Sequence, residues 1–325
     1  MAKDIRIVVH TPDLDGVWDA FVDRSNNGTL FHRQAFLSYH GKKIAKQFEH
    51  LLFYRGETLT AVLPMGWMDE NGIRGCRSPY GASFGGLVTL EPHHAETDEL
   101  ILAFLSHAKE NGVKNITITP PPAIYHQRLD ANLEFSLLRN GFKVVTRELC
   151  QVVDLRRNAN LDLLETYAYS CDKQIRKAIK LGLSVRRTEN VEGFHAMLEV
   201  NRRKHGVMPT HSLEDLRNLF AKQPESMILF GAYRGEVLEA GLLAMVAQRK
   251  VLLNFYTCSR EEAQGTGADN LINHEALLWA RAHDFHYYDF GTSSLGMQPN
   301  LGLIRFKESF GSGSILRDTY RWQAP

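Results

Sequence analysis

Two stretches of the chain repeat the same order of apolar and polar positions. The apolar run Leu51–Tyr54 leads into Arg-Gly-Glu and then into a second apolar run at 59–65. The run Ile228–Tyr233 likewise leads into Arg-Gly-Glu and then into 238–245. Apolar runs of strand length on both sides of a glycine turn are typical of a β-hairpin, because glycine readily adopts a positive φ. The sequence therefore predicts one hairpin in each half of the chain.

Each predicted hairpin is followed by a glycine site and then by an amphipathic helix. Gly85–Gly86 precede a helix expected over 97–111, and Gly265 precedes a helix expected over 268–283. Apolar side chains recur in both segments at spacings of three and four, which places them on one helix face. A short strand is expected after each helix, at 116–119 and at 286–290. Strands that alternate with helices predict an α/β fold.

The repeat divides the chain into two predicted domains. One strand is expected directly after the turn at Gly141 and another at Cys150–Leu155, followed by the polar stretch Arg156–Asn160. The predicted domains are therefore 1–157 and 158–325, each with a mixed sheet flanked by helices. A length of 325 residues suits two such domains better than one.

Composition and charge narrow the class of protein. Hydrophobic residues make up 44% and charged residues 23%, which is typical of a globular protein. The apolar runs are of strand length and the N-terminus lacks the apolar core of a signal peptide, so no transmembrane segment and a cytoplasmic location are expected. With a net charge of +1, any contact with nucleic acid must come from a local basic patch. The four cysteines form no Cys-x-x-Cys pair and the 14 histidines show no metal-ligand spacing, so free thiols and no metal are expected.

Four segments resemble the FemABX family, the Fem peptidyltransferases, whose members consist of two GNAT-like domains. Three are Cys76–Leu87 with its Gly-Gly-Leu, the basic segment Asp172–Val185, and Arg305–Gly311 with its Phe-Lys-x-x-Phe-Gly. The fourth runs from Gly265-Thr-Gly to Tyr-Asp-Phe-Gly at 288–291. The resemblance implies two tandem GNAT-like domains with the donor site in the second domain.

The resemblance also implies a reaction. Fem enzymes move an aminoacyl group from charged tRNA to an amine of a peptidoglycan precursor, and GNAT relatives move an acyl group from acyl-CoA to an amine. The first expectation is therefore a Fem-like aminoacyltransferase with no tightly bound cofactor, and with aminoacyl-tRNA or acyl-CoA as donor co-substrate. An acyl-CoA-dependent N-acetyltransferase acting on a small metabolite or sugar is the second. A non-catalytic relative that keeps the fold is the third.

Candidate catalytic residues follow from the closing motifs. The resemblance aligns Lys307 with a family lysine that stabilises the developing oxyanion, and an ammonium fixed beside that oxygen lowers the barrier. A solvated surface lysine is the alternative, because most lysines lie on the surface. Asp289 lies at an expected strand end, where ligands of open α/β sheets bind, and is a candidate to accept a proton or hold the amine. A turn-forming role before Gly291 is its alternative.

Candidate donor-binding residues are Gly265, Thr266, Gly267 and Phe306. Glycines at a helix start let backbone amides approach a phosphate. In acyl-CoA enzymes the matching loop begins with Gln or Arg, whereas Glu262 stands at that position here and Glu261 adjoins it. Two carboxylates beside a pyrophosphate count against a CoA donor. A tight turn leading into a helix is the structural alternative.

Candidate acceptor-binding residues lie in both halves. Lys173, Arg176, Lys177 and Lys180 share one face of a predicted helix, which indicates a contact with phosphates of tRNA or of a nucleotide-linked precursor, or else a solvated helix face. Of these, Lys173 and Arg176 are taken as acceptor-binding. Arg77, Tyr80 and Ser83 are expected to form one wall of an acceptor cleft between the domains, or a plain loop. No Gly-x-Ser-x-Gly or phosphate-binding loop motif is present, so a hydrolase or NTPase is disfavoured.

Overall fold

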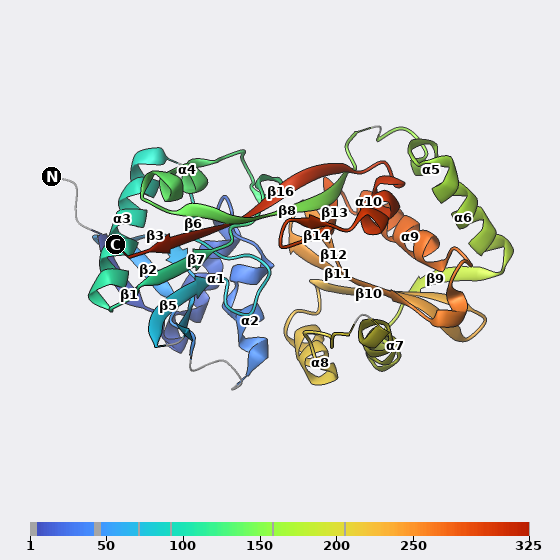
Figure 1. The fold of residues 1–325 in the computed structure, drawn as a ribbon, viewed down its shortest axis with the longest axis horizontal. Helices are drawn as coiled ribbons and strands as arrows, with labels where there is room; N and C mark the ends of the chain where they lie inside the picture. Colours follow the sequence, from blue (N-terminus) through green and yellow to red (C-terminus); the bar gives the residue numbers. More distant parts are fainter. Residues whose placement is uncertain are drawn as a thin grey trace. The chain divides into compact units, whose positions relative to one another are not determined.

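The computed structural model describes residues 5–41, 47–70, 72–91, 93–157, 159–204 and 206–324 (Figure 1). The chain forms two compact units: unit 1 is 1–148 with 316–325, and unit 2 is 149–315. These limits differ from the expected 1–157 and 158–325. The two strands expected after Gly141 and at Cys150–Leu155 are one continuous strand, β8 (Lys143–Asp154), so the division between the units falls inside it. Asn158, in the stretch expected as a linker, lies outside the described residues.

Unit 1 contains two groups of paired strands. One is the antiparallel series β1-β2-β3-β6, and the other is β4-β5-β7-β16, in which only β5 and β7 are parallel. The strands are β1 (Ile5–Val9), β2 (Leu51–Arg55), β3 (Thr58–Leu63), β4 (Gly66–Glu70), β5 (Ile73–Ser78), β6 (Val88–Thr89), β7 (Asn115–Ile118) and the end of β16 (Gly313–Gln323). The helices are α1 (Asp15–Arg24), α2 (Gln34–Leu37), α3 (His94–Glu110) and α4 (Asn132–Arg139), with 3-10 turns at Pro12–Leu14, Leu30–His32, Ser38–His40 and Ala123–Tyr125.

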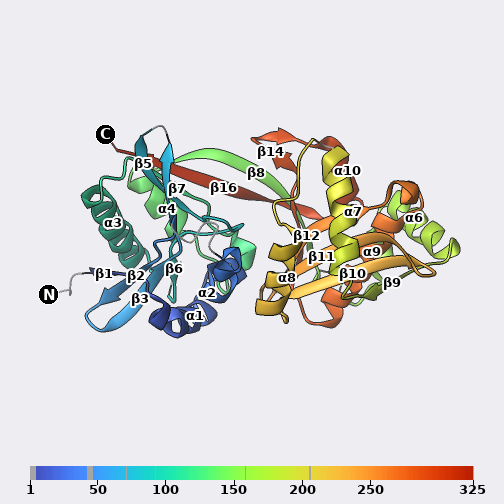
Figure 2. The ribbon, with the colours of Figure 1, turned by 90° about the horizontal axis from the view of Figure 1, so that it is seen from below.

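Unit 2 is built on the strand order β8-β13-β12-β11-β10-β9. Its strands are β9 (Leu183–Arg187), β10 (Met227–Arg234), β11 (Val237–Gln248), β12 (Val251–Ser259), β13 (Tyr287–Thr292), and the small pair β14 (Ser294–Leu295) and β15 (Gln298–Pro299). Its helices are α5 (Leu163–Thr166), α6 (Tyr169–Lys180), α7 (Val191–Lys204), α8 (Leu213–Lys222), α9 (Ala268–Ala282) and α10 (Leu301–Glu308), with a 3-10 turn at Glu261–Ala263. Within this unit, α7 and α8 cover one face of the sheet, and α6 and α9 cover the other (Figure 2).

Both predicted hairpins are present, and they share a local irregularity. The β2–β3 register shifts between Phe53 and Tyr54, and the β10–β11 register shifts between Ala232 and Tyr233. Each bulge lies just before a turn glycine of positive φ, Gly56 at 62° and Gly235 at 60°. A bulge twists a strand locally, so the repeat extends from the amino-acid pattern to the backbone.

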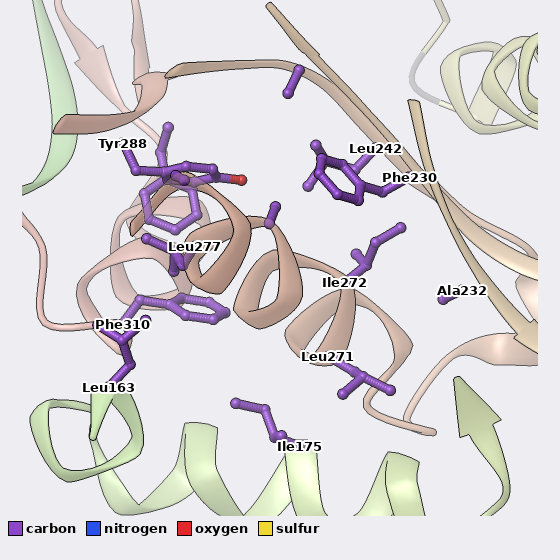
Figure 3. Close-up of a cluster of buried hydrophobic side chains, with 14 of the residues drawn as sticks. Leu163, Ile175, Phe230, Ala232, Leu242, Leu271, Ile272, Leu277, Tyr288 and Phe310 are labelled. Atoms are coloured by element: carbon purple, nitrogen blue, oxygen red, sulfur yellow. The ribbon is translucent and has the colours of Figure 1, made fainter. Parts of the chain in front are cut away.

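The core of unit 2 forms around α9. Leu271, Ile272 and Leu277 of this helix lie among side chains from the sheet and from the neighbouring helices (Figure 3). Phe230 and Leu242 come from the sheet, and Ile175 comes from α6. The spacing of 1 and 5 residues places the three α9 side chains on adjoining faces, which suits a helix enclosed between a sheet and another helix. The start of α9 is thereby fixed by packing on two sides.

The two parallel strands of unit 2 pair only at their beginnings. β12 pairs with β13 over Val251–Leu253 and Tyr287–Asp289. Beyond that point β12 continues to Ser259 and β13 to Thr292 without pairing with each other. The backbone groups of both strand ends are therefore left for other partners, and the residues described next lie there.

Candidate functional site

Lys307 is a buried lysine whose ammonium group is held by main-chain carbonyls. It lies on α10, with only 5% of its surface exposed. Its Nζ donates to the carbonyl oxygen of Gly291 at 2.9 Å and to that of Thr292 at 2.8 Å. A buried ammonium without such partners would be strongly destabilising. Lys307 is thus not the solvated surface lysine that its residue type favours.

Burial changes the ionisation of Lys307. Desolvation lowers the pKa of its ammonium group from 10.5 to about 8, and the nearby charge of Asp289 acts in the opposite direction. Two of the three N–H groups of the ammonium are used by Gly291 and Thr292, which leaves one N–H for a further acceptor. The lysine is therefore a cation near neutral pH with one donor position to offer.

The carbonyls that hold Lys307 belong to an irregular end of β13. The pairing of β13 with β8 shifts register between Asp289, opposite Val152, and Thr292, opposite Cys150. Gly291 has a φ of 71°, a conformation that favours glycine. The Oδ1 atom of Asp289 accepts from the N–H of Gly291 at 2.6 Å. Asp289 therefore shapes the turn that presents the Gly291 carbonyl to Lys307. The sequence Asp-Phe-Gly supplies both the carboxylate that accepts from the turn and the glycine that adopts the positive φ.

A buried polar network links this strand end to α9, and the sequence pattern did not single it out. Asn273 is fully buried, and its Oδ1 accepts from the Nδ2 of Asn254 at 2.8 Å and from the hydroxyl of Tyr288 at 3.0 Å. Its own Nδ2 donates to the carbonyl of Asp269 at 2.8 Å. These bonds join β12, β13 and α9 where the two strands stop pairing. The available signal was an asparagine among the apolar residues of the α9 core face, since buried amides are normally hydrogen-bonded.

The glycine loop before α9 has the backbone of an anion-binding turn. Gly265 and Gly267 have φ values of 72° and 87°, and α9 begins directly afterwards. The hydroxyl of Thr266 donates to the carbonyl of Ala263 at 2.6 Å. Within the described residues, the N–H groups of Gly267, Asp269 and Asn270 have no acceptor. Unpaired amides at a helix start attract anions.

Helix α6 reaches the glycine loop through one basic side chain. Nζ of Lys177 donates to the carbonyl of Gly265 at 2.6 Å. A Cβ at Gly267 would clash with the carbonyl oxygen of Gln174, so α6 and the loop approach each other at backbone distance. Lys173 is exposed, and Arg176 binds the carboxylate of Asp172 at 2.8 Å on its own helix. Of the predicted basic face, it is Lys177 that meets the candidate donor loop.

The acidic residues before the loop are neutralised by cations. The carboxylate of Glu261 lies 2.8 Å from Nζ of Lys204, and that of Glu262 lies 3.4 Å from Nε of Arg260. Arg260 and Lys204 both lower the pKa of the Glu262 carboxyl group, after its own backbone hydrogen bond. The expected repulsion of a pyrophosphate by two carboxylates is reduced by these pairs.

The remaining candidates lie elsewhere. Phe306 is partly buried against the unit 2 core, with its ring 5.4 Å from that of Phe310. In unit 1, Arg77 is exposed at the end of β5, and Ser83 is half-buried. Tyr80 lies against Gly66, and its ring packs edge-on against the ring of Phe48, with 6.1 Å between the ring centroids. Through these contacts Tyr80 stabilises the loop that follows β5.

Neither a metal-binding cluster nor a membrane-spanning helix is found among the described ranges. Among those residues, no group of three or more His, Cys, Asp or Glu side chains could hold a metal ion. None of the helices described combines the length and the apolar character that crossing a membrane requires.

One known protein family and several solved structures are similar to this chain. Residues 167–307 match the acetyltransferase (GNAT) domain family, a segment that begins before α6 and ends at Lys307. No curated protein matches the sequence.

Solved structures match nearly the whole chain at low sequence identity. FemX superposes with a TM-score of 0.71 at 16% identity, covering 98% of this chain and 97% of FemX. The C-terminal domain (DUF2156) of a putative lysylphosphatidylglycerol synthetase from Agrobacterium fabrum has a TM-score of 0.63 at 10% identity, covering 96% of this chain and 92% of that one. A tandem GNAT protein from the clavulanic acid biosynthesis pathway has a TM-score of 0.57 at 12% identity, covering 99% of both chains. The α/β fold expected from the repeat is confirmed: the chain has the tandem GNAT fold, and the segment similar to the acetyltransferase (GNAT) domain family lies within unit 2.

Proposed function

We propose that this protein transfers an aminoacyl or acyl group to a primary amine, with the donor bound in unit 2 and Lys307 stabilising the oxyanion. In such a reaction the amine attacks the carbonyl carbon of an ester or thioester. The carbonyl oxygen gains negative charge, the amine loses a proton, and the donor alcohol or thiol leaves with a proton. A protein that aligns the two reactants and stabilises the oxyanion supplies most of the catalysis.

The observation that carries the proposal is a buried, oriented ammonium group that has one N–H to which the described part of the chain offers no acceptor. The carbonyls of Gly291 and Thr292 fix two of the N–H groups of Lys307, so the third has a set direction. A charge-assisted hydrogen bond from this group to an oxyanion is stronger in a partly dry site than in water. Neighbouring Asp289 raises the pKa of Lys307 against burial, which keeps the lysine protonated near neutral pH.

Asp289 has a positioning role in this proposal. Its Oδ1 is bonded to the N–H of Gly291, and it thereby orients one of the carbonyls that hold Lys307. A second role, as acceptor of the proton from the attacking amine, is compatible with an ionised carboxylate that makes this bond, because each carboxylate oxygen has more than one lone pair.

The leading donor is a charged tRNA and the leading acceptor is a peptidoglycan precursor. The resemblance of four segments to the Fem family supports this pair, and so does the likeness in fold to FemX. Exposed Lys173 on α6 lies on the same helix as Lys177, which contacts the glycine loop before α9. A basic surface beside the donor loop suits a polyanionic donor. Arg77, Tyr80 and Ser83 of unit 1 are proposed to contact the acceptor.

Acyl-CoA is the second candidate donor, because of two observations. Residues 167–307 match a GNAT acetyltransferase domain, and the described residues offer no acceptor to three amides at or just before the start of α9, a feature that suits a pyrophosphate site. Because Glu261 and Glu262 are paired with Lys204 and Arg260, their carboxylates oppose a pyrophosphate less than bare acids would.

The test is a transfer assay with two donors. The purified protein is incubated with a nucleotide-linked muropeptide and either a charged tRNA pool or acetyl-CoA. Transfer is followed by mass spectrometry as an increase in the mass of the muropeptide. Lys307→Met should reduce the rate with the active donor by about a hundredfold or more, as loss of one oxyanion donor does. The conservative surface change Lys180→Met is the control and should leave the rate unchanged. Full turnover by Lys307→Met would refute the role of Lys307, and no transfer from either donor would count against the reaction itself.

A further inference from the structure

A pocket of about 600 Å³ lies in unit 2 between α7 and the turn of the β10–β11 hairpin. We call it the α7 pocket. It is lined by residues of α7, of the β10–β11 turn with the start of β11, and of the segment from the end of β12 to Glu262. We propose that the α7 pocket binds an aliphatic diamine or polyamine, a methylene chain that carries two or more ammonium groups. The proposal is independent of the transfer reaction.

One wall of the pocket is apolar and open to solvent. Val200 of α7 is 55% exposed and Val237 of β11 is 46% exposed, although both face the pocket. Met197 forms a more buried part of the same wall, at 8% exposure. Gly193 and Ala196 are small, so α7 leaves room in front of the hairpin. The volume falls in the range of small-molecule sites, and the open apolar surface suits a methylene chain.

The lip of the pocket favours cations. It carries three carboxylates, Glu236, Glu261 and Glu262, against one guanidinium, Arg260. Each carboxylate has a surface partner, with N···O distances of 3.5, 2.8 and 3.4 Å. Their side chains are 92%, 70% and 70% exposed, so water screens these ion pairs and each is weak. A ligand ammonium can therefore replace or join the present partners of these carboxylates.

The carboxylates come from two different elements, which is why a ligand with separated charges fits better than a single cation. Glu236 lies in the hairpin turn, and Glu261 and Glu262 lie in the 3-10 turn after β12. A chain with an ammonium group at each end can bind both elements and cover the apolar wall between them. A bound ligand would also touch the segment Arg260–Glu262, from which the chain continues to the glycine loop at Gly265.

The probe for the test is 1,8-diaminooctane, and the measurement is isothermal titration calorimetry. We expect one molecule to bind per chain. The double substitution Glu236→Gln/Glu261→Gln should weaken binding about fivefold or more, since it removes an ion pair at each end. Ala196→Phe should weaken it to a similar degree by filling the pocket, and position 196 is exposed, so the added ring does not disturb the core. The chain offers a matched control in Glu57→Gln, since Glu57 occupies the same position in the hairpin turn of unit 1.

Several results would overturn the proposal. The absence of binding heat with the unsubstituted protein would do so. Equal affinity for 1,8-octanediol, which has the same chain without charge, would show that the carboxylates play no part. Unchanged affinity in both the double variant and Ala196→Phe would place the diamine elsewhere on the protein, as would an equal loss in Glu57→Gln. Displacement of the diamine by an equal concentration of Mg²⁺ would indicate screening of surface charge and not a site for a methylene chain.

Discussion

The two glycine sites occupy equivalent places in the repeat, but their backbone amides have different partners. In unit 1 the N–H of Gly85 donates to the carbonyl of Thr119 at 2.9 Å, and the N–H of Gly86 donates to the hydroxyl of Ser78 at 2.7 Å. In unit 2, by contrast, the described part of the chain offers no acceptor to the N–H of Gly267. The unit 1 site is closed by its own hydrogen bonds, whereas the unit 2 site has amides to offer to a ligand.

A helix follows the glycine site directly in unit 2 but not in unit 1. In unit 2, α9 begins at Ala268, immediately after Gly267, so the amides of its first turn add to the loop. In unit 1, the short strand β6 comes between, and α3 begins only at His94. After β7 the chain of unit 1 runs through three prolines at 120–122, which carry no N–H, where unit 2 has Asp-Phe-Gly. Of the two units, unit 2 therefore has the backbone features that the proposed donor site requires.

The largest expected effect comes from adding a methyl group at Gly267. Its φ of 87° disfavours any other residue, and its Cβ would clash with the carbonyl of Gln174. Gly267→Ala should therefore lower the free energy of unfolding by about 3 kcal/mol and the melting temperature by about 6 °C or more.

Gly85→Ala is the matched change in unit 1, where a Cβ would clash with the backbone of Pro79. Both variants should melt earlier in differential scanning calorimetry, but only Gly267→Ala should weaken donor binding when both are folded. An equal loss of donor affinity in Gly85→Ala would remove the distinction between the two sites.

The second effect concerns the cation beside the donor loop. Lys177→Met removes the bond from α6 to the Gly265 carbonyl and a positive charge next to the unpaired amides. The dissociation constant of the active donor should rise about tenfold, as expected for one charge-assisted contact. Lys180→Met, one turn further along the same exposed face, is the control and should change it little. Equal effects of the two changes, measured by equilibrium binding, would indicate a general attraction and no particular role for Lys177.

The sequence predicted the hairpins, α9 and the α/β fold because glycine turns and apolar spacing are local signals. The basic face of α6 was predicted as well, but not that Lys177 would be the member that reaches the donor loop. That contact depends on how closely α6 approaches Gly267, which is a property of packing between distant segments. The burial of Lys307 was not predictable either, since it requires the two carbonyls of a bulged strand end. Continuous β8 was divided into two expected strands because the polar residues Thr146, Arg147 and Glu148 interrupt its apolar pattern.

The smallest expected effect is a change in the pH dependence of the transfer rate. It concerns the Asp-Phe-Gly segment of β13, where unit 1 has prolines. The oxyanion role requires protonated Lys307, whose pKa is about 8, so the rate should fall as the pH rises through that value. The charge of Asp289 raises this pKa, so Asp289→Asn should lower it and move the alkaline limb of the rate profile to lower pH, by about half a unit to one unit. The same variant keeps an oxygen that can accept from the N–H of Gly291, so the turn should persist and the melting temperature should change little.

The control is Glu308→Gln, a change at an exposed neighbour on α10. It removes a charge without the contact to Gly291 and should leave the pH–rate profile in place. An unshifted limb in Asp289→Asn, measured on kcat between pH 6 and 10, would mean that the titrating group is not Lys307 and that the strand end of unit 2 does not act through its charge.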